Sequence, residues 1–403
     1  MSILDNSTTR VVIALGSTTA IQTLVTMASL TVAVFAPQAA KEIGVPASSI
    51  GVYASLTYVG AMLGSLVAGG FILRYGPIRF SQGAMLVCAL GLAISAGAAW
   101  WWFVISALIF GIGYGPTTPA SSYILSRHTP SANWSLLFSI KQTGVPLGGV
   151  VAGLVIPFLL LSFNWREVAL IIAGLIVVGV LLLQSLRRRF DTEPDATQTL
   201  VSGNVIGPLR LVFSNRKLRL LAISSFFFSA TQQSYVYYLV TYLEIGLDWT
   251  TQAAGLALSV LGLSAVVGRV AWGAYADARG NALVVLALLA FGMGLSAIVS
   301  GFFSVAWTSL TVLSVCAIFG ATGAAWNGIY IAEITRSVGP EEVGHATGGG
   351  LFVTFAGVMT APPLFGLLVD ITDGFVWPYI LLGLGPIVTG VVLLTRSRNS
   401  EEA

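Results

Sequence analysis

Long apolar blocks recur along the whole chain, and they constrain its fold more than any other feature of the sequence. They lie between Arg10 and Arg396 and are separated by short breaks rich in Gly, Pro and charged residues. Each block is roughly 20 residues or longer, enough for a helix to cross the ~30 Å hydrocarbon core of a bilayer. Backbone groups in lipid must be hydrogen-bonded within their own segment, so helices are expected. The ~10-residue alternation of outer-membrane barrel strands does not occur.

The composition agrees with this interpretation. Of the 403 residues, 56% are hydrophobic and only 9% are charged, too few to cover the surface of a soluble protein. The first block is too long for a cleavable signal and lacks a small-x-small cleavage site. Cys88 and Cys316 both lie inside apolar blocks, which argues against a disulfide or metal framework. The net charge of +3 reflects membrane topology and does not indicate nucleic-acid binding.

The pattern predicts an all-α membrane protein with twelve transmembrane helices. We expect them over residues 10–36, 48–72, 80–99, 103–126, 135–160, 166–186, 217–243, 251–274, 282–303, 306–334, 343–368 and 377–396. The longest polar stretch lies in the middle of the chain and divides it into two halves. The predicted organisation is an N-terminal six-helix bundle (1–186), a cytoplasmic linker (187–216) and a C-terminal six-helix bundle (217–403).

The basic residues are distributed unequally between the two sides of this arrangement. Only Lys41 and Arg166 fall in loops of one side. The other side holds both chain ends and most of the arginines, including Arg74, Arg79, Arg127, Arg187, Arg188, Arg189, Arg210, Arg216, Arg219, Arg279 and Arg336. Cytoplasmic loops carry the excess of Lys and Arg. The sequence therefore predicts cytoplasmic termini and a multi-pass protein of the cell (plasma or inner) membrane.

A short motif occurs once in each half. Residues 69–76 (GGFILRYG) follow the expected second helix, and residues 273–280 (GAYADARG) follow the eighth. Glycine permits close helix approach and tight turns. Asp277 could accept hydrogen bonds from the N-terminus of a neighbouring helix. Duplicated halves of this kind are typical of transporters.

The second copy resembles the G-x-x-x-D-x-x-G loop signature of the major facilitator superfamily at Gly273, Asp277, Arg279 and Gly280. In the first copy Leu73 stands at the position of the acid. The resemblance extends over the whole chain through helix number, central loop and topology. It implies two pseudo-symmetric six-helix bundles and a solute carrier that is not an enzyme and needs no cofactor.

Two further segments resemble the branch that contains monocarboxylate transporters and the oxalate–formate exchanger. They are residues 268–273 (GRVAWG) and 361–370 (APPLFGLLVD). In that branch the helix-eight arginine binds the substrate carboxylate, which implies this role for Arg269. The chain departs from the branch in two places. Ala265 stands where proton-linked monocarboxylate transporters have an aspartate, and helix eleven lacks the lysine of the oxalate exchanger, offering Gly350, Phe352, Thr354 and Phe355.

Lys141 and Arg269 are the two cations expected inside helices. All 16 acidic residues fall in loops or near helix ends. A cation in hydrocarbon costs at least ~2.5 kcal/mol, so each should face a cavity or a partner. In the superfamily fold helices five and eight face each other, so the resemblance implies that the two cations converge on an anion, most simply a carboxylate. Two alternatives stay open: Arg269 could pair with Glu333 in a cytoplasmic gate, and Lys141 could snorkel to the surface.

Polar and aromatic residues at helical spacing are predicted to complete the site. They are Gln22 and Thr26 on the first helix, Tyr53 on the second, Tyr114 on the fourth, Gln142 on the fifth, Gln233 and Tyr237 on the seventh, Trp326, Asn327 and Tyr330 on the tenth, and Phe352 on the eleventh. Each aromatic alone is more often a packing residue. Gln233 and Asn327 are favoured, because a buried amide needs partners. Asp277, Arg279 and Glu333 are predicted to contribute to a cytoplasmic gate.

These features predict a secondary transporter of a small organic anion, a mono- or dicarboxylate, working by alternating access. With no carboxylate in mid-membrane, exchange or uniport fits directly, whereas proton symport would need Lys141 to titrate. The alternative is proton-coupled efflux of hydrophobic or cationic compounds. That class would place an acid in the pocket, and its helix-four arginine is replaced here by Ala107. An enzyme or sensor is disfavoured, since His128 and His345 are isolated. The expected partners are a small organic anion and membrane lipid, not nucleic acid, for a monomeric protein.

Overall fold

The computed structural model describes residues 7–45, 50–97, 99–192, 194–198, 206–249 and 251–401. Within these ranges all regular elements are helical, and eleven helices are long and apolar enough to cross a membrane. They coincide with eleven of the twelve predicted segments. The predicted seventh segment lies inside α11 (Arg216–Leu247), which is continuous but rich in Ser, Thr, Gln and Tyr and is not among the eleven. Twelve spans and cytoplasmic termini therefore stay predictions.

The chain forms two compact units. Unit 1 comprises residues 1–131, 141–218 and 334–352, and unit 2 comprises residues 132–140, 219–333 and 353–403. Each unit is built mainly from one half of the sequence, and each incorporates a short segment from the other half. The bundle boundaries predicted from the sequence, at residues 187 and 216, stay a prediction.

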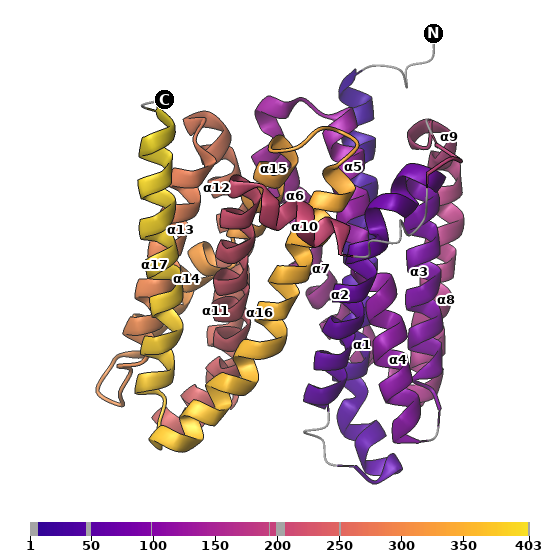
Figure 1. The fold of residues 1–403 in the computed structure, drawn as a ribbon. Helices are drawn as coiled ribbons and strands as arrows, with labels where there is room; N and C mark the ends of the chain where they lie inside the picture. The colour runs from indigo at the N-terminus through magenta and orange to yellow at the C-terminus, as the bar shows by residue number, and fades with distance from the viewer. Residues whose placement is uncertain are drawn as a thin grey trace. The chain divides into compact units, whose positions relative to one another are not determined.

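Unit 1 contains most helices of the N-terminal half. They are α1 (Ser7–Ile43), α2 (Ile50–Tyr75), α3 (Pro77–Ile94), α4 (Trp100–Tyr114), α5 (Thr117–His128), α7 (Gly144–Leu159), α8 (Trp165–Leu183), α9 (Arg187–Phe190) and α10 (Gly207–Ser214). The helix α2 packs on α4, α1 on α7, and α3 on both α4 and α8, as Figure 1 shows. Glycines permit the closest of these contacts: a Cβ on Gly111 of α4 would collide with the backbone of α2 at Thr57.

Unit 2 contains the C-terminal helices and a short one from the N-terminal half. They are α6 (Trp134–Gln142, of which 134–140 belong to this unit), α11, α12 (Thr251–Arg279), α13 (Ala282–Ser300), α14 (Ser309–Gly323), α15 (Trp326–Arg336), α16 (Val343–Thr372) and α17 (Val376–Glu401). The helix α13 packs on α17 and α14, and α12 packs on α14. The end of α15 and the first ten residues of α16 belong to unit 1.

Three segments predicted as single helices are each divided in two. The α4–α5 break lies at Pro116, which has no N–H to continue the ladder, and the α6–α7 break precedes Pro146 for the same reason. The α14–α15 break contains no proline. Ala324 there has φ −109° and ψ 0°, outside the helical region. The breaks matter because two of them lie beside the intramembrane cations.

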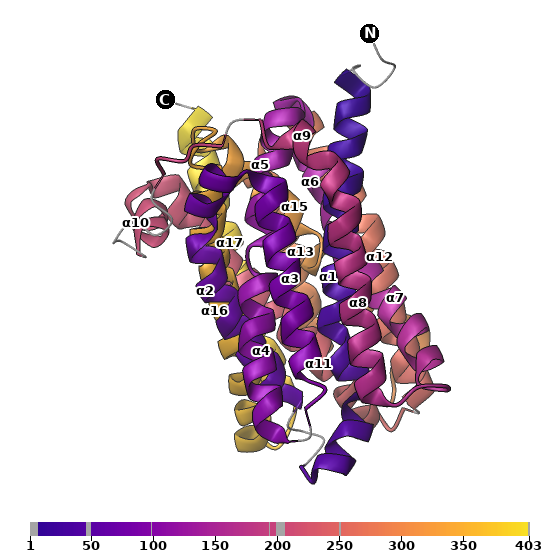
Figure 2. The same ribbon diagram turned by 90° about the vertical axis from the view of Figure 1, so that its right-hand side faces the viewer.

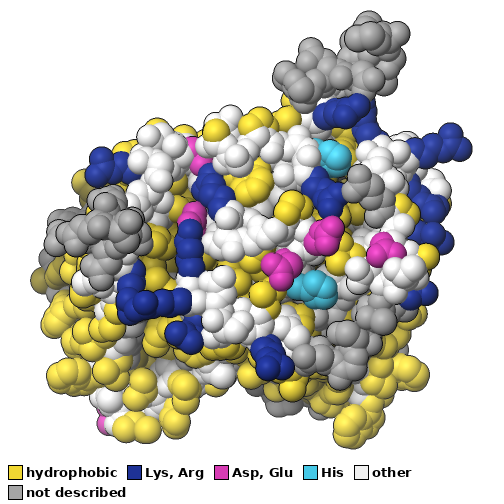
Figure 3. Space-filling view, turned by 45° about the horizontal axis from the view of Figure 1, so that its top comes forward, with side chains coloured by type: hydrophobic (Ala, Val, Ile, Leu, Met, Phe, Trp, Pro, Cys, Tyr) yellow, Lys and Arg dark blue, Asp and Glu magenta, His cyan; other side chains and the backbone are white. Residues whose placement is uncertain are grey.

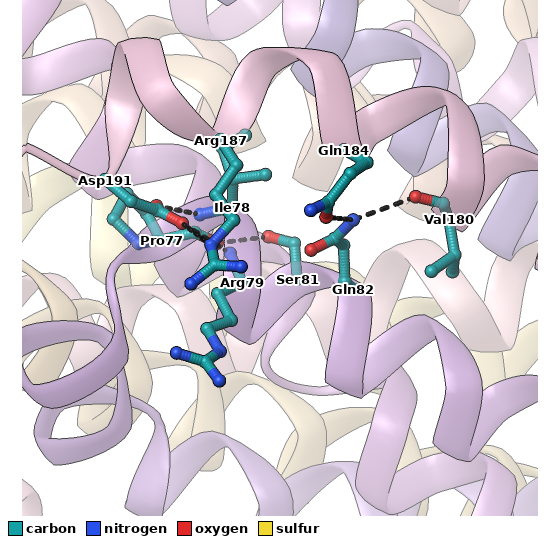
Figure 4. A network of polar contacts seen from close by, with 9 residues as sticks. All are labelled: Pro77, Ile78, Arg79, Ser81, Gln82, Val180, Gln184, Arg187 and Asp191. Carbon is teal, nitrogen blue, oxygen red and sulfur yellow. Dashed lines mark hydrogen bonds and ion pairs between the residues drawn. The ribbon is translucent and has the colours of Figure 1, made fainter.

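A carboxylate from beyond α8 fixes the start of α3 in unit 1. Asp191 accepts hydrogen bonds from the backbone amides of Ile78 (2.8 Å) and Arg79 (3.0 Å), as Figure 4 shows. These amides have no partner inside the helix, so the carboxylate caps α3. Burial raises the pKa of Asp191, although the two amides favour its ionised form. One turn further along α3, Gln82 donates to the carbonyl of Val180 (2.9 Å), which joins α3 to α8.

Candidate functional site

Lys141 lies in the last turn of α6 and is 1% exposed. Its ammonium donates to Oε1 of Gln22 (2.8 Å) and Oε1 of Gln142 (3.1 Å), and lies 3.4 Å from Oγ1 of Thr118. Neutral oxygens such as these solvate an ammonium without cancelling its charge. The burial of the side chain weighs against the snorkelling alternative.

The amide of Gln22 links Lys141 to two further helices. Because the ammonium is only a donor, the atom of Gln22 that faces it must be the carbonyl oxygen. The amide nitrogen of Gln22 then donates to Thr26 on α1 (3.2 Å). The hydroxyl of Thr118, on α5, donates to the amide oxygen of Gln22 (3.4 Å). The sequence prediction brought together Lys141, Gln22 and Gln142 but missed Thr118, whose position follows from the helix break at Pro116.

Arg269, on α12, is 4% exposed and lies at the break between α14 and α15. Its Nε donates to the carbonyl of Ala324 (2.8 Å). The last carbonyls of a helix have no partner within it, and a cation there is favoured by the helix dipole. Arg269 therefore stabilises the helix break. Glu333 is also buried, on α15, and its pairing with Arg269 stays a prediction.

A second cluster of predicted residues forms around Trp326 in unit 2. The indole Nε1 of Trp326 donates to Oε1 of Gln232 (3.0 Å), and Nδ2 of Asn327 lies 3.5 Å from the same oxygen. The ring of Trp326 meets those of Phe228 and Tyr330 edge to face. Gln232 was missed by the sequence prediction. Adjacent positions on a helix point about 100° apart, and only the partners on α15 distinguish Gln232 from the predicted Gln233.

Several other predicted residues make contacts of their own within the part of the chain that the structure describes. Tyr237 is 50% exposed on α11, and Gln233, one turn earlier, is half-buried. Tyr53 is buried against α4, with its hydroxyl 3.3 Å from that of Ser106. Tyr114 stacks with a neighbouring ring at the end of α4, and Phe352 is half-buried on α16. Their roles as substrate contacts stay predictions.

The duplicated motif makes equivalent contacts in the two units. In unit 2, a Cβ on Gly273 would lie 2.7 Å from Oγ of Ser139, so glycine permits α6 to approach α12. In unit 1, Gly69 of α2 lies under the imidazole of His345 on α16 in the same way. The closing glycines Gly76 and Gly280 have φ +87° and +70°, a conformation that favours glycine.

Asp277 makes the hydrogen bonds that its motif predicts. Its two carboxylate oxygens accept from the backbone amides of Ser135 (3.1 Å) and Leu136 (2.8 Å), in the first turn of α6. The carboxylate thus satisfies amides that have no partner within the helix, and its charge favours the positive end of the dipole. Arg279 is exposed at the end of α12. The gating roles of Asp277, Arg279 and Glu333 stay predictions.

Replacing Asp277 with Asn is expected to weaken the contact between α12 and α6. Loss of a charged cap costs roughly 1 kcal/mol, about a fivefold change in the opening equilibrium. Hydrogen exchange of a peptide covering residues 131–142 should therefore become about fivefold faster. Asp248→Asn is the control, because Asp248 is an exposed carboxylate of the same unit with φ 55°, which Asn tolerates. Unchanged exchange in Asp277→Asn would show that the cap does not hold α6.

Apolar helices long enough to span a membrane, a motif repeated in both halves and a cation buried in each unit define a membrane transporter. The chain matches the family model described as Major Facilitator Superfamily over residues 18–355. It therefore belongs to this superfamily, as the motif at residues 273–280 predicted, and is a multi-pass membrane transporter rather than an enzyme.

Curated relatives include the monocarboxylate transporters that the sequence resembles. Monocarboxylate transporter 13 of Rattus norvegicus is 26% identical over 348 residues, covering 85% of this chain and 78% of the relative. Monocarboxylate transporter 12 of Homo sapiens is 25% identical over 372 residues, covering 83% and 66%. The hexuronate transporter of Bacillus subtilis is 23% identical over 368 residues, covering 86% and 85%.

Solved structures share the fold at low sequence identity. The Escherichia coli fucose:proton symporter has a TM-score of 0.74 at 16% identity, covering 96% of this chain and 99% of the other. The human organic anion transporter TETRAN has a TM-score of 0.72 at 16% identity, covering 95% and 99%. These likenesses confirm the all-helical superfamily fold.

Proposed function

We propose that this transporter carries a small organic anion, a mono- or dicarboxylate, and that Lys141 binds its carboxylate. The observation that carries the proposal is the buried ammonium of Lys141, whose contacts with Gln22, Gln142 and Thr118 are with neutral oxygens. These residues orient the ammonium, and a carboxylate on the substrate would complement its positive charge. The names of two kinds of relative, monocarboxylate and hexuronate transporters, support a carboxylate substrate.

In unit 2 we assign the anion-binding role to Arg269. Its Nε is engaged by the carbonyl of Ala324, which fixes the plane of the guanidinium. A planar guanidinium suits bidentate binding of a carboxylate. Gln232, Asn327 and Trp326 of the same unit supply amide groups and an aromatic face for the rest of the substrate.

The positions of the acids support a proposal for the coupling mode. No acidic residue lies in the middle of a predicted span, and a proton-coupled carrier of the usual kind needs a titrating carboxylate there. We therefore propose anion exchange or uniport, with proton symport requiring titration of Lys141 itself. Counterflow measured in proteoliposomes at two pH values distinguishes anion exchange, uniport and proton symport.

A ligand screen tests the substrate class directly. Purified protein is heated with monocarboxylates, dicarboxylates and hexuronates, each paired with its neutral amide. A true substrate at 100 times its Kd stabilises the folded state by ~2.7 kcal/mol, seen as a rise in Tm. The paired amide should not stabilise, because it lacks the charge that Lys141 binds. Equal stabilisation by acids and amides, or by no carboxylate at all, would contradict the proposal.

A further inference from the structure

The helix α10, between the two halves of the chain, has two distinct faces. Pro208 and Val212, one turn apart, are buried. On the opposite side the N-cap residue Ile206 is followed at helical spacing by Arg210 and Phe213, and all three are exposed, Ile206 by 65% and Phe213 by 43%. Figure 2 shows α10 projecting to the side near one end of α2. Large apolar side chains on a peripheral helix need a partner other than water.

The buried face of α10 is held against the first part of α16, within unit 1. A Cβ on Gly349 of α16 would collide with the carbonyl oxygen of Pro208 and would lie 2.9 Å from a methyl group of Val212. The two helices are therefore packed backbone to backbone at this point. This packing fixes the direction in which Ile206, Arg210 and Phe213 project.

The segment of the chain that contains α10 carries only basic charges. The sequence contains no acidic residue between Asp195 and Glu244, whereas Arg210, Arg216, Lys217 and Arg219 fall in this interval. Basic side chains are also exposed on the end of unit 1 that carries α9 (Figure 3). Asn215 accepts hydrogen bonds from the amides of Lys217 (2.9 Å) and Leu218 (3.1 Å), and so begins α11 directly after α10. The helix α10 thus lies at the end of a long helix in the region predicted to be cytoplasmic.

We propose that the exposed face of α10, formed by Ile206, Arg210 and Phe213, binds anionic phospholipid in the adjoining leaflet. Amphipathic helices with basic and large apolar residues lie at the boundary between headgroups and acyl chains. Ile206 and Phe213 would enter the acyl region. The guanidinium of Arg210 would bind the headgroup phosphate in bidentate fashion. The surrounding basic residues select lipids with net negative charge.

Lipid bound at this face has a consequence for transport. It stabilises α10 in the position where Pro208 contacts Gly349, and thereby stabilises the start of α16 within unit 1. The conformational equilibrium of the transporter then depends on the anionic lipid content of the membrane. This inference does not depend on the identity of the substrate.

The test places a fluorophore on α10 of the full-length protein. Phe213→Cys is labelled with bimane, which reaches this site selectively because Cys88 and Cys316 are buried. The labelled protein is reconstituted in vesicles containing brominated phosphatidylglycerol or brominated phosphatidylcholine. Quenching by brominated phosphatidylglycerol should be the stronger of the two, and aqueous acrylamide should quench weakly. Bimane on Glu341→Cys, in an exposed loop, should instead be quenched strongly by acrylamide and weakly by both brominated lipids.

A charge variant tests the role of Arg210. When Arg210→Gln is added to the labelled Phe213→Cys protein, the preference for phosphatidylglycerol over phosphatidylcholine should fall about fivefold, which is the effect of one basic residue near an anionic surface. Arg188→Gln removes an equal exposed charge from α9 and should leave the preference unchanged. Strong acrylamide quenching at residue 213 without lipid quenching would overturn the interfacial position. Equal quenching by the two lipids, or an unchanged preference in Arg210→Gln, would overturn the binding of anionic lipid.

Discussion

Carboxylate transport by Lys141→Gln is expected to fall about 100-fold in proteoliposomes. Truncating one partner of a buried charge pair costs roughly 2–5 kcal/mol, and 100-fold corresponds to about 2.7 kcal/mol. Glutamine can still bond to Gln22 and Gln142 but lacks the charge. Lys141→Arg keeps the charge and should retain part of the flux, limited by the larger guanidinium in a site that is 1% exposed.

Stability measurements separate loss of binding from misfolding in this variant. Glutamine can bond to the amide oxygens that Lys141 contacts and costs less to desolvate than an ammonium, so the Tm of substrate-free Lys141→Gln should stay close to that of the parent. The rise in Tm on adding carboxylate should disappear. Lys41→Gln, which removes an exposed lysine at the end of α1, should leave both flux and Tm unchanged. Normal carboxylate flux in Lys141→Gln would rule out the proposed role.

Arg269→Gln should lower both transport and stability. The Nε of Arg269 binds the free carbonyl of Ala324, and leaving that buried acceptor unsatisfied costs roughly 1–3 kcal/mol. The Tm of the substrate-free protein should therefore fall, unlike that of Lys141→Gln. If Arg269 also binds the anion, flux should fall at least about tenfold, and Arg269→Lys should restore charge but not the planar geometry.

A double-mutant cycle tests whether the two cations act on one anion. If both contact the same carboxylate, the loss of flux in Lys141→Gln combined with Arg269→Gln should be smaller than the product of the single losses. Independent effects would instead multiply. Arg188→Gln serves as the charge control, because it removes an exposed arginine outside the site. A fall in Tm with unchanged substrate affinity in Arg269→Gln would assign Arg269 to the helix break alone.

The comparison of sequence with structure shows where local patterns are sufficient. Apolar block length and the absence of mid-span acids were enough to predict helical spans and to single out Lys141 and Arg269. The motif also indicated the partner of Asp277, because its charge and the glycine before it suit the N-terminus of a neighbouring helix. These are properties of a residue type at a given depth or spacing, and the sequence displays them directly.

Helix breaks and side-chain partners required the tertiary structure. The break at Ala324 contains no proline that would predict it, and the buried carbonyl of Ala324 is bound by Arg269, 55 residues away in the chain. Gln232 and Gln233 are alike in the sequence, and only Trp326 on another helix gives one of them a specific contact. Likewise Thr118 lies on α5, and only the tertiary structure brings its hydroxyl to Lys141 on α6.

The amino-acid sequence by itself determined that the chain crosses a membrane as helices, that its two halves share a motif, and that two cations must be accommodated within it. It could do so because the cost of exposing polar groups to lipid depends on each segment's own composition. The tertiary structure decided which oxygens hold Lys141, that Arg269 stabilises a helix break, and which segments of each half belong to the opposite unit. Those choices depend on packing between residues far apart in the chain, which no local pattern contains.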